Sequence, residues 1–241
     1  MIQQPSRLVP GWLLDEVTSA GRENLDAGHV AHYDDKEEGD ASSESQLLAR
    51  LGLCRGSIVI DIGAGTGQFT LACAPLCAQI IAVDVSQVML TRLQSKVDAA
   101  KLDNVRVVNA GFLTYEHNGM FADFVYTRWA LHHLPDFWKS IALRNMRNML
   151  KTGGVLRLSD IVFSFDSSDA QHRVEQWCST LPVDADGEYE WRRADLEEHI
   201  RNEHSTYSWL LEPMIERAGF NIECAEHSAD GFFSTYVARA V

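Results

Sequence analysis

From residue 57 onward, short apolar runs alternate with longer amphipathic stretches. The apolar runs are rich in β-branched residues and predict strands at 57–62, 79–84, 105–110, 122–127 and 154–161. The amphipathic stretches predict helices at 67–75, 86–101 and 136–150. Ser86 is the expected N-cap of the second helix, and Gly153 and Gly154 are expected to end the third. Strands that are apolar on both faces indicate a parallel sheet with helices on each side.

The two ends of the chain extend this pattern. Helices are expected at 8–20 and 42–52, before the first strand, and at 206–218, where Gly219 follows. Strands at 220–226 and 232–240, joined by a turn at Asp230 and Gly231, predict an antiparallel pair. Residues 166–205 are polar and acidic and predict a helical lid. We expect one domain made of an N-terminal helical segment (1–52), a core (53–165), the lid (166–205) and a last helix with two strands (206–241).

Composition and charge narrow the range of partners. Lys and Arg number 21 against 34 Asp and Glu, so the formal net charge is −13, which opposes binding to the phosphates of nucleic acids. No apolar run approaches the roughly 18 residues that cross a bilayer, and the N-terminus lacks the pattern of a secretory signal. We therefore expect a soluble, cytoplasmic protein that binds neither nucleic acid nor membranes. The sequence does not indicate an oligomeric state.

The five cysteines indicate reduced thiols in the core, because they are odd in number and scattered through apolar segments. Cys73 and Cys77 lie four residues apart on a predicted helix and share a face. No nearby Cys or His pair completes a zinc set with them. We therefore expect no metal site.

The run V-I-D-I-G-A-G-T-G (59–67) carries the main chemical signal, because a strand that breaks into glycines before a helix usually faces a ligand. A dinucleotide fingerprint needs Gly at position 68, which is Gln, and a P-loop needs Lys after Gly67. Both phosphate-binding interpretations are therefore weak. Asp84 ends the next strand, where a carboxylate suits the two hydroxyls of a ribose. Together with Asp61, this favours a nucleoside that carries positive charge.

At this point the sequence resembles the class I S-adenosylmethionine-dependent methyltransferases. The resemblance rests on the glycine run, on I-I-A-V-D-V-S-Q-V-M-L, on A-D-F-V-Y-T-R-W-A-L-H-H-L-P-D and on L-K-T-G-G-V-L-R-L-S-D, and it covers about residues 45–165. The ending A-G-F-N-I-E-C-A-E is similar to the last helix and strand pair of the family. The resemblance implies an α/β, Rossmann-like three-layer sandwich with seven strands, of which the last is antiparallel, and S-adenosylmethionine as cofactor.

The resemblance also implies roles for individual residues at the cofactor site. The glycine loop would contact the amino-acid and ribose portions, Asp61 would orient the loop and the methionyl ammonium, and Asp84 would bind the ribose hydroxyls. The family often has an acid after the third strand that binds the adenine amino group, but N-A-G-F-L (109–113) contains none. The expected cofactor-binding residues are Tyr33, Asp61, Gly63, Ala64, Gly65, Thr66, Gly67, Asp84, Val85, Met89, Gly111, Phe112 and Arg128.

The resemblance also implies that the start of the segment T-R-W-A-L-H-H-L-P-D faces the reacting sulfonium. Arg128 would meet the methionyl carboxylate or a substrate anion, and Trp129 would wall the transfer chamber. His132 is a candidate general base, with His133 and His32 as alternatives. One of the two adjacent histidines is expected to stabilise the turn. Tyr33 is expected to close over the cofactor and to contact the reacting groups.

We therefore expect methyl transfer by in-line displacement to a small molecule, because aromatic residues in the lid suit an enclosed organic substrate. Two alternatives remain open at this point. One is a non-catalytic protein that binds S-adenosylmethionine or a partner. The other is a different nucleotide-dependent enzyme on the same fold.

Overall fold

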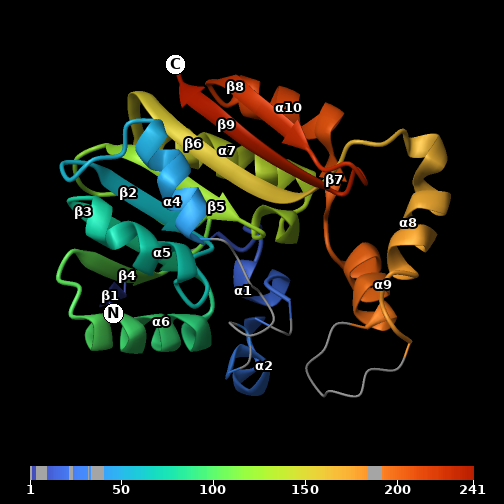
Figure 1. The fold of residues 1–241 in the computed structure, drawn as a ribbon, viewed down its shortest axis with the longest axis horizontal. Coiled ribbons are helices and arrows are strands. Elements are labelled where there is room, and N and C mark those ends of the chain that lie inside the picture. The colour runs from blue at the N-terminus through green and yellow to red at the C-terminus, as the bar shows by residue number, and fades with distance from the viewer. Residues whose placement is uncertain (1, 4–9, 22–23, 32, 34–40, 184–191) are drawn as a thin grey trace.

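The computed structural model describes residues 2–3, 10–21, 24–31, 33, 41–183 and 192–241. Their strands form one sheet of nine strands with helices on both faces (Figure 1). The strands run in the order β1-β4-β3-β2-β5-β6-β9-β8, and the two-residue β7 pairs with β6. The strands are β1 (Ile2–Gln3), β2 (Ile58–Ile62), β3 (Gln79–Asp84), β4 (Val105–Asn109), β5 (Ala122–Arg128), β6 (Leu150–Phe163), β7 (Thr206–Tyr207), β8 (Phe220–His227) and β9 (Phe233–Ala240).

The pairing confirms the expected Rossmann-like α/β architecture. Strands β1 to β6 pair in parallel, and β9 is antiparallel to both β6 and β8. The seven strands predicted from the apolar runs are all present. The very short β1 and β7 were not expected, because two residues carry no periodicity.

The helices follow the prediction with two corrections. They are α1 (Glu16–Ser19), α2 (Ala27–Ala31), α4 (Ala41–Arg50), α5 (Gln68–Cys73), α6 (Gln87–Ala100), α7 (Asp136–Met149), α8 (Ala170–Cys178), α9 (Arg193–Asn202) and α10 (Ser208–Arg217). Ser86 caps α6 as predicted, by accepting a hydrogen bond from the backbone N–H of Met89. Residues 8 and 9 of the helix expected at 8–20 lie outside the described residues, and of residues 10–20 only α1 is helical, because the side chain of Asp15 accepts hydrogen bonds from the first turn and starts the helix there.

The second correction concerns the end of α7. The glycines at 153 and 154 were expected to stop this helix, but α7 ends at Met149 and passes directly into β6. Leu150 already pairs with Ala122 of β5, ahead of a register shift in the ladder. The two glycines therefore lie within the strand and do not separate it from the helix.

The side chains of each central strand divide between two apolar layers. Ile58, Ile60 and Ile62 of β2 pack into the layer that α7 and α10 cover, whereas Val59 packs into the layer of α4 and α5. All four are buried, as expected for a parallel sheet covered on both faces. In the described part of the chain, no helix is long and apolar enough to cross a membrane.

A buried ion pair crosses one of these layers. The guanidinium of Arg157, in β6, donates from Nε and from one terminal nitrogen to the two carboxylate oxygens of Glu44, in α4, over 2.9 and 2.7 Å. The two side chains are only 8% and 16% exposed. Because a buried charge that loses its partner is poorly solvated, removal of either residue is costly. This pair therefore fixes α4 on the sheet beside the glycine loop.

We expect Glu44→Ala to lower the free energy of unfolding by about 3 kcal/mol, as measured by urea denaturation. The matched control is Glu223→Ala, which breaks a similar two-point pair with Arg239 in which both side chains are 35% exposed. That change is expected to cost less than about 1 kcal/mol, because an exposed pair is solvated after it breaks. Equal losses in the two variants would contradict the structural role of Glu44.

Candidate functional site

Two adjoining cavities lie at the carboxyl ends of the central parallel strands. The first cavity is lined by residues at the ends of β2, β3, β4 and β5, together with Glu16, Ala20 and Asn24 from the N-terminal segment. The second cavity lies on the other side of the glycine loop, around Asp61. Both cavities share a wall made by Tyr33, Gly63, Gly65, Arg128 and Trp129. Strand β2 has β3 on one side and β5 on the other, and such a reversal of strand order is where open α/β sheets bind ligands.

Most of the residues predicted from the sequence line these cavities. The first cavity receives Asp84, Val85, Met89, Gly111, Phe112 and His133, and the second receives Asp61, Ala64 and Thr66. Gly67 and His132 line neither. A Cβ at Gly67 would lie 2.0 Å from Cδ1 of Leu93, so this glycine lets α5 approach α6. The expected contact of Gly67 with a cofactor stays a prediction.

Asp84 is prepared to accept further hydrogen bonds. One of its carboxylate oxygens accepts from the backbone N–H of Gly65 at 2.9 Å, and the other accepts from that of Ser86 at 2.7 Å. Each oxygen retains a lone pair, and the side chain faces the first cavity. Burial raises the pKa of Asp84, with these backbone hydrogen bonds opposing the shift. The carboxylate is thus held in one orientation, with acceptor capacity to spare.

Asp61 lies at the end of β2 and is almost completely buried. Its carboxylate accepts a hydrogen bond of 2.6 Å from the hydroxyl of Thr70 in α5. Burial raises its pKa to about 7, the hydroxyl of Thr70 opposes this shift, and the nearby charge of Asp84 adds to it. A cation placed in the second cavity would therefore be favoured by this carboxylate.

Glu16 is the site residue that the sequence did not indicate. It comes from α1, is 7% exposed and lines the first cavity. Its carboxylate accepts hydrogen bonds of 3.1 Å from the backbone N–H of Leu113 and from the hydroxyl of Thr114. A Cβ at Gly111 would lie 2.4 Å from Oε1 of Glu16. The carboxyl of Glu16 therefore occupies the space that a side chain at position 111 would take.

Burial raises the pKa of Glu16 to about 7, against the effect of its hydrogen bonds with Leu113 and Thr114. The sequence pointed to Glu16 only indirectly, because the segment 109–113 contains no acid of its own. An acid from another part of the chain reaches the end of β4 only when the chain folds. Glu16 and Asp84 thus place two carboxylates in the same cavity.

The wall shared by the two cavities contains an unusual backbone conformation. Trp129 has φ of +49°, which is rare for a bulky residue, and its N–H donates to the carbonyl of Ser159 at 2.9 Å. The guanidinium of Arg128 lies 4.0 Å from the centre of the Trp129 ring, a distance at which the cation is attracted to the ring face. Both side chains thus stand together at the end of β5, in the wall that the two cavities share.

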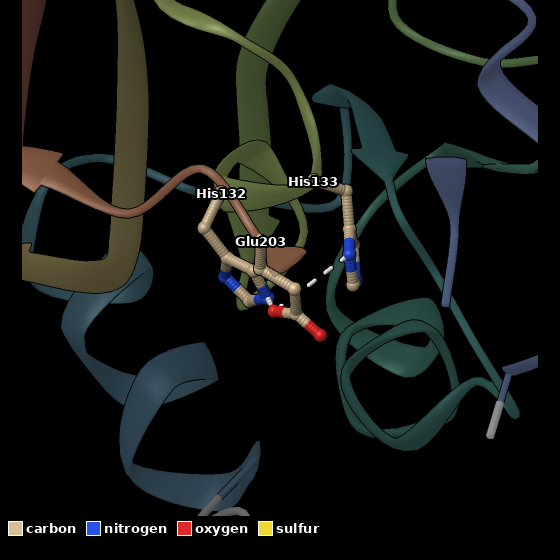
Figure 2. A group of neighbouring side chains, drawn as sticks. All are labelled: His132, His133 and Glu203. Carbon is tan, nitrogen blue, oxygen red and sulfur yellow. Dashed lines mark ion pairs between the residues drawn. The ribbon is translucent and has the colours of Figure 1, made fainter. Parts of the chain in front are cut away.

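His132 is held between the carboxylates of Asp160 and Glu203, and Figure 2 shows its contact with Glu203. Its Nδ1 lies 2.5 Å from Oδ1 of Asp160, and its Nε2 lies 3.0 Å from Oε2 of Glu203. Burial lowers the pKa of His132, but the two carboxylates outweigh it and raise the pKa to about 10. This conflicts with the prediction of a general base, because a ring that keeps its proton at neutral pH cannot accept another.

His133 has the opposite character. It lines the first cavity, and its Nδ1 lies 3.9 Å from Oε2 of Glu203. Burial, together with the charge on His132, lowers the pKa of His133 to about 3. This ring stays neutral at neutral pH and is a weak base. The third histidine considered as a base, His32, lies outside the described residues.

Comparison with known proteins agrees with this arrangement. A sequence model of the family described as a methyltransferase domain matches residues 59–154. The chain is similar to phosphoethanolamine N-methyltransferase 1 of Caenorhabditis elegans, at 28% identity over 124 residues, or 52% of this chain and 26% of that protein. It is also similar to a demethylmenaquinone methyltransferase of Shouchella clausii, at 29% identity over 116 residues, or 47% of this chain and 48% of that protein. The chain thus spans less than half the length of either relative.

A solved structure shows the same fold. The structure of an S-adenosylmethionine-dependent methyltransferase from Clostridium acetobutylicum superposes with a TM-score of 0.67 at 16% identity, and the match covers 88% of this chain and 98% of that one. Residues 59–154 thus match a methyltransferase domain, and the chain is similar in sequence to methyltransferases and in fold to an S-adenosylmethionine-dependent methyltransferase.

Proposed function

We propose that this protein transfers the methyl group of S-adenosylmethionine to a small-molecule acceptor by in-line displacement. The observation that carries the proposal is the cavity in which Asp84, Glu16 and Arg128 stand around the glycine loop. Two relatives support the substrate class, since their names specify phosphoethanolamine and demethylmenaquinone. The net charge of −13 also disfavours a nucleic-acid substrate.

Asp84 and the glycine loop suit the ribose of S-adenosylmethionine. Asp84 keeps a lone pair on each carboxylate oxygen while the backbone of Gly65 and Ser86 holds the group in place, so it is able to accept from two neighbouring hydroxyls. Gly63 allows close approach of the loop, since a Cβ there would lie 2.4 Å from Cβ of Ala130. We assign ribose binding to Asp84 on this basis.

We assign the adenine end to Glu16, Met89 and Phe112. Met89 and Phe112 are buried, line the first cavity and offer apolar surface to a base. Glu16 supplies a carboxyl at Gly111, where this chain lacks an acid of its own. A carboxylate oxygen that accepts from Leu113 or Thr114 is still able to accept a further hydrogen bond from an exocyclic amino group.

The remaining residues surround the reacting end. The cofactor supplies an electrophilic methyl group on a sulfonium. Arg128 is placed to bind a carboxylate, and Tyr33 and Trp129 form the wall that excludes water. Neither His132 nor His133 has the pKa of an efficient base. We therefore propose that catalysis rests on alignment of the acceptor, which also revises the catalytic role expected for His132.

Incubation with a labelled methyl donor and the small-molecule fraction of a cell extract is expected to yield a labelled product. Asp84→Ala is the matched control and should yield little label, because the donor is held by that carboxylate. Labelled product should also resist nuclease and protease treatment. Label that enters only protein or nucleic acid would refute the small-molecule assignment.

Asp84→Ala is expected to weaken binding of S-adenosylmethionine by about 100-fold, because two hydrogen bonds to a charged group are lost. Isothermal titration calorimetry measures this effect, and circular dichroism checks the fold. Asp84→Asn, which keeps the shape of the side chain, should lose less affinity. A parallel titration with NAD should show no binding, and unchanged affinity in Asp84→Ala would remove the residue from the site.

Glu16→Ala is expected to weaken binding of S-adenosylhomocysteine by about tenfold, because an acceptor for the adenine amino group is lost. The inosine analogue of this ligand lacks that amino group, so wild type should bind it less tightly than the adenosine form. In Glu16→Ala the difference in affinity between the two forms should be smaller. Glu116→Gln, an exposed acid beyond the same loop, is the control. Equal discrimination in wild type and Glu16→Ala would contradict the role of Glu16.

A further inference from the structure

His132, His133 and Glu203 place three potential metal-ligand atoms within 4.8 Å of one another. The two histidines lie in the short 3-10 turn after β5 (Leu131–His133), and Glu203 follows α9 in the lid segment. Figure 2 shows the carboxylate of Glu203 between the two rings. The fold thus joins donors that lie seventy residues apart in the chain.

The cluster leaves two buried polar atoms without hydrogen bonds among the described residues. These atoms are Nδ1 of His133 and Oε2 of Glu203. Oε2 lies 3.0 Å from Nε2 of His132 and 2.5 Å from Nδ1 of His199, so three histidines gather around one carboxylate oxygen. Such unsatisfied buried groups are costly and call for an explanation. A cation between them would satisfy both.

The ring of His132 is also held on the side away from Glu203. Asp160 accepts from Nδ1 of His132, so Nε2 is the nitrogen that faces Glu203. The side-chain amide nitrogen of Asn24 lies 3.5 Å from Nε2 of His133, and Nδ1 is the nitrogen of this ring that lies 3.9 Å from Glu203. Histidine ligands of metals are commonly oriented by a carboxylate that accepts from their second nitrogen, as Asp160 accepts from His132.

The charge around the cluster suits a cation. Asp160 and Glu203 flank His132 on its two sides, and both side chains are largely buried. The positive charge of a divalent ion bound at Nε2 of His132 would be attracted to both carboxylates.

We propose that His132, His133 and Glu203 form a binding site for one divalent transition-metal ion, such as Zn²⁺ or Co²⁺. Two imidazole nitrogens and one carboxylate oxygen match the ligand preference of these ions, and three protein ligands leave a position for water or for an acceptor atom. His133 also lines the first cavity. The ion would therefore fasten the lid to the end of β5, beside the reacting groups. Metal binding is measured without methyl transfer, so its failure is separate from failure of the proposed function.

The test is titration of the full chain, dialysed against a chelator, with Co²⁺ followed by absorption spectroscopy and with Zn²⁺ followed by calorimetry. Wild type is expected to bind one ion per chain. Glu203→Gln and His133→Gln are each expected to weaken binding by at least about tenfold, because each removes one ligand. Using both variants keeps the test valid if one fails to fold, which circular dichroism shows.

Three controls separate this site from adventitious binding. Glu198→Gln changes an exposed acid of the same helix α9, and His172→Ala removes an exposed histidine of α8. A third variant replaces the two exposed cysteines, Cys54 and Cys224, with serine. All three should bind the ion as wild type does. Absence of binding to wild type, or binding that survives both ligand variants, would overturn the proposal.

Discussion

The close approach of Gly63 to Ala130 is the contact on which the site depends. A Cβ at Gly63 would lie 2.4 Å from Cβ of Ala130, so only glycine lets the loop after β2 touch the segment after β5. The N–H of Gly63 also donates to the carbonyl of Val83 in β3. Three strand ends are thereby fixed together. They carry Asp84 on one side and Arg128 with the two histidines on the other.

Buried negative charge is the second feature that unites the site. Burial raises the pKa of Asp61 and of Glu16 to about 7 and raises that of Asp84 as well. Each shift measures a cost of keeping the carboxylate ionised in a poorly solvated place. A ligand with positive charge reduces this cost, whereas a pyrophosphate increases it. The electrostatics of the cavities therefore agree with a sulfonium cofactor, as the absence of Lys after Gly67 already indicated.

The sequence predicted what depends on local pattern and missed what depends on tertiary contact. Apolar periodicity located seven strands, and Ser86 marked the start of α6. Both signals depend on a few residues that are adjacent in the chain. Glu16 was missed, since only folding brings α1 against Gly111. Glu203, a member of the proposed metal site, was missed for the same reason. The expectation of no metal site rested on the cysteines, which are not part of that cluster.

The histidine pair shows why residue type alone does not assign chemistry. His132 and His133 are adjacent in the chain, yet one lies between two carboxylates and the other faces a cavity. The pKa of His132 is therefore raised and the pKa of His133 is lowered. Both shifts follow from burial combined with neighbouring charge. An efficient general base at neutral pH needs a pKa of about 7, and neither environment gives its histidine such a pKa. Reactivity at this site must then come from how the acceptor is placed, from the acceptor's own ionisation, or from an ion bound where the two rings meet Glu203.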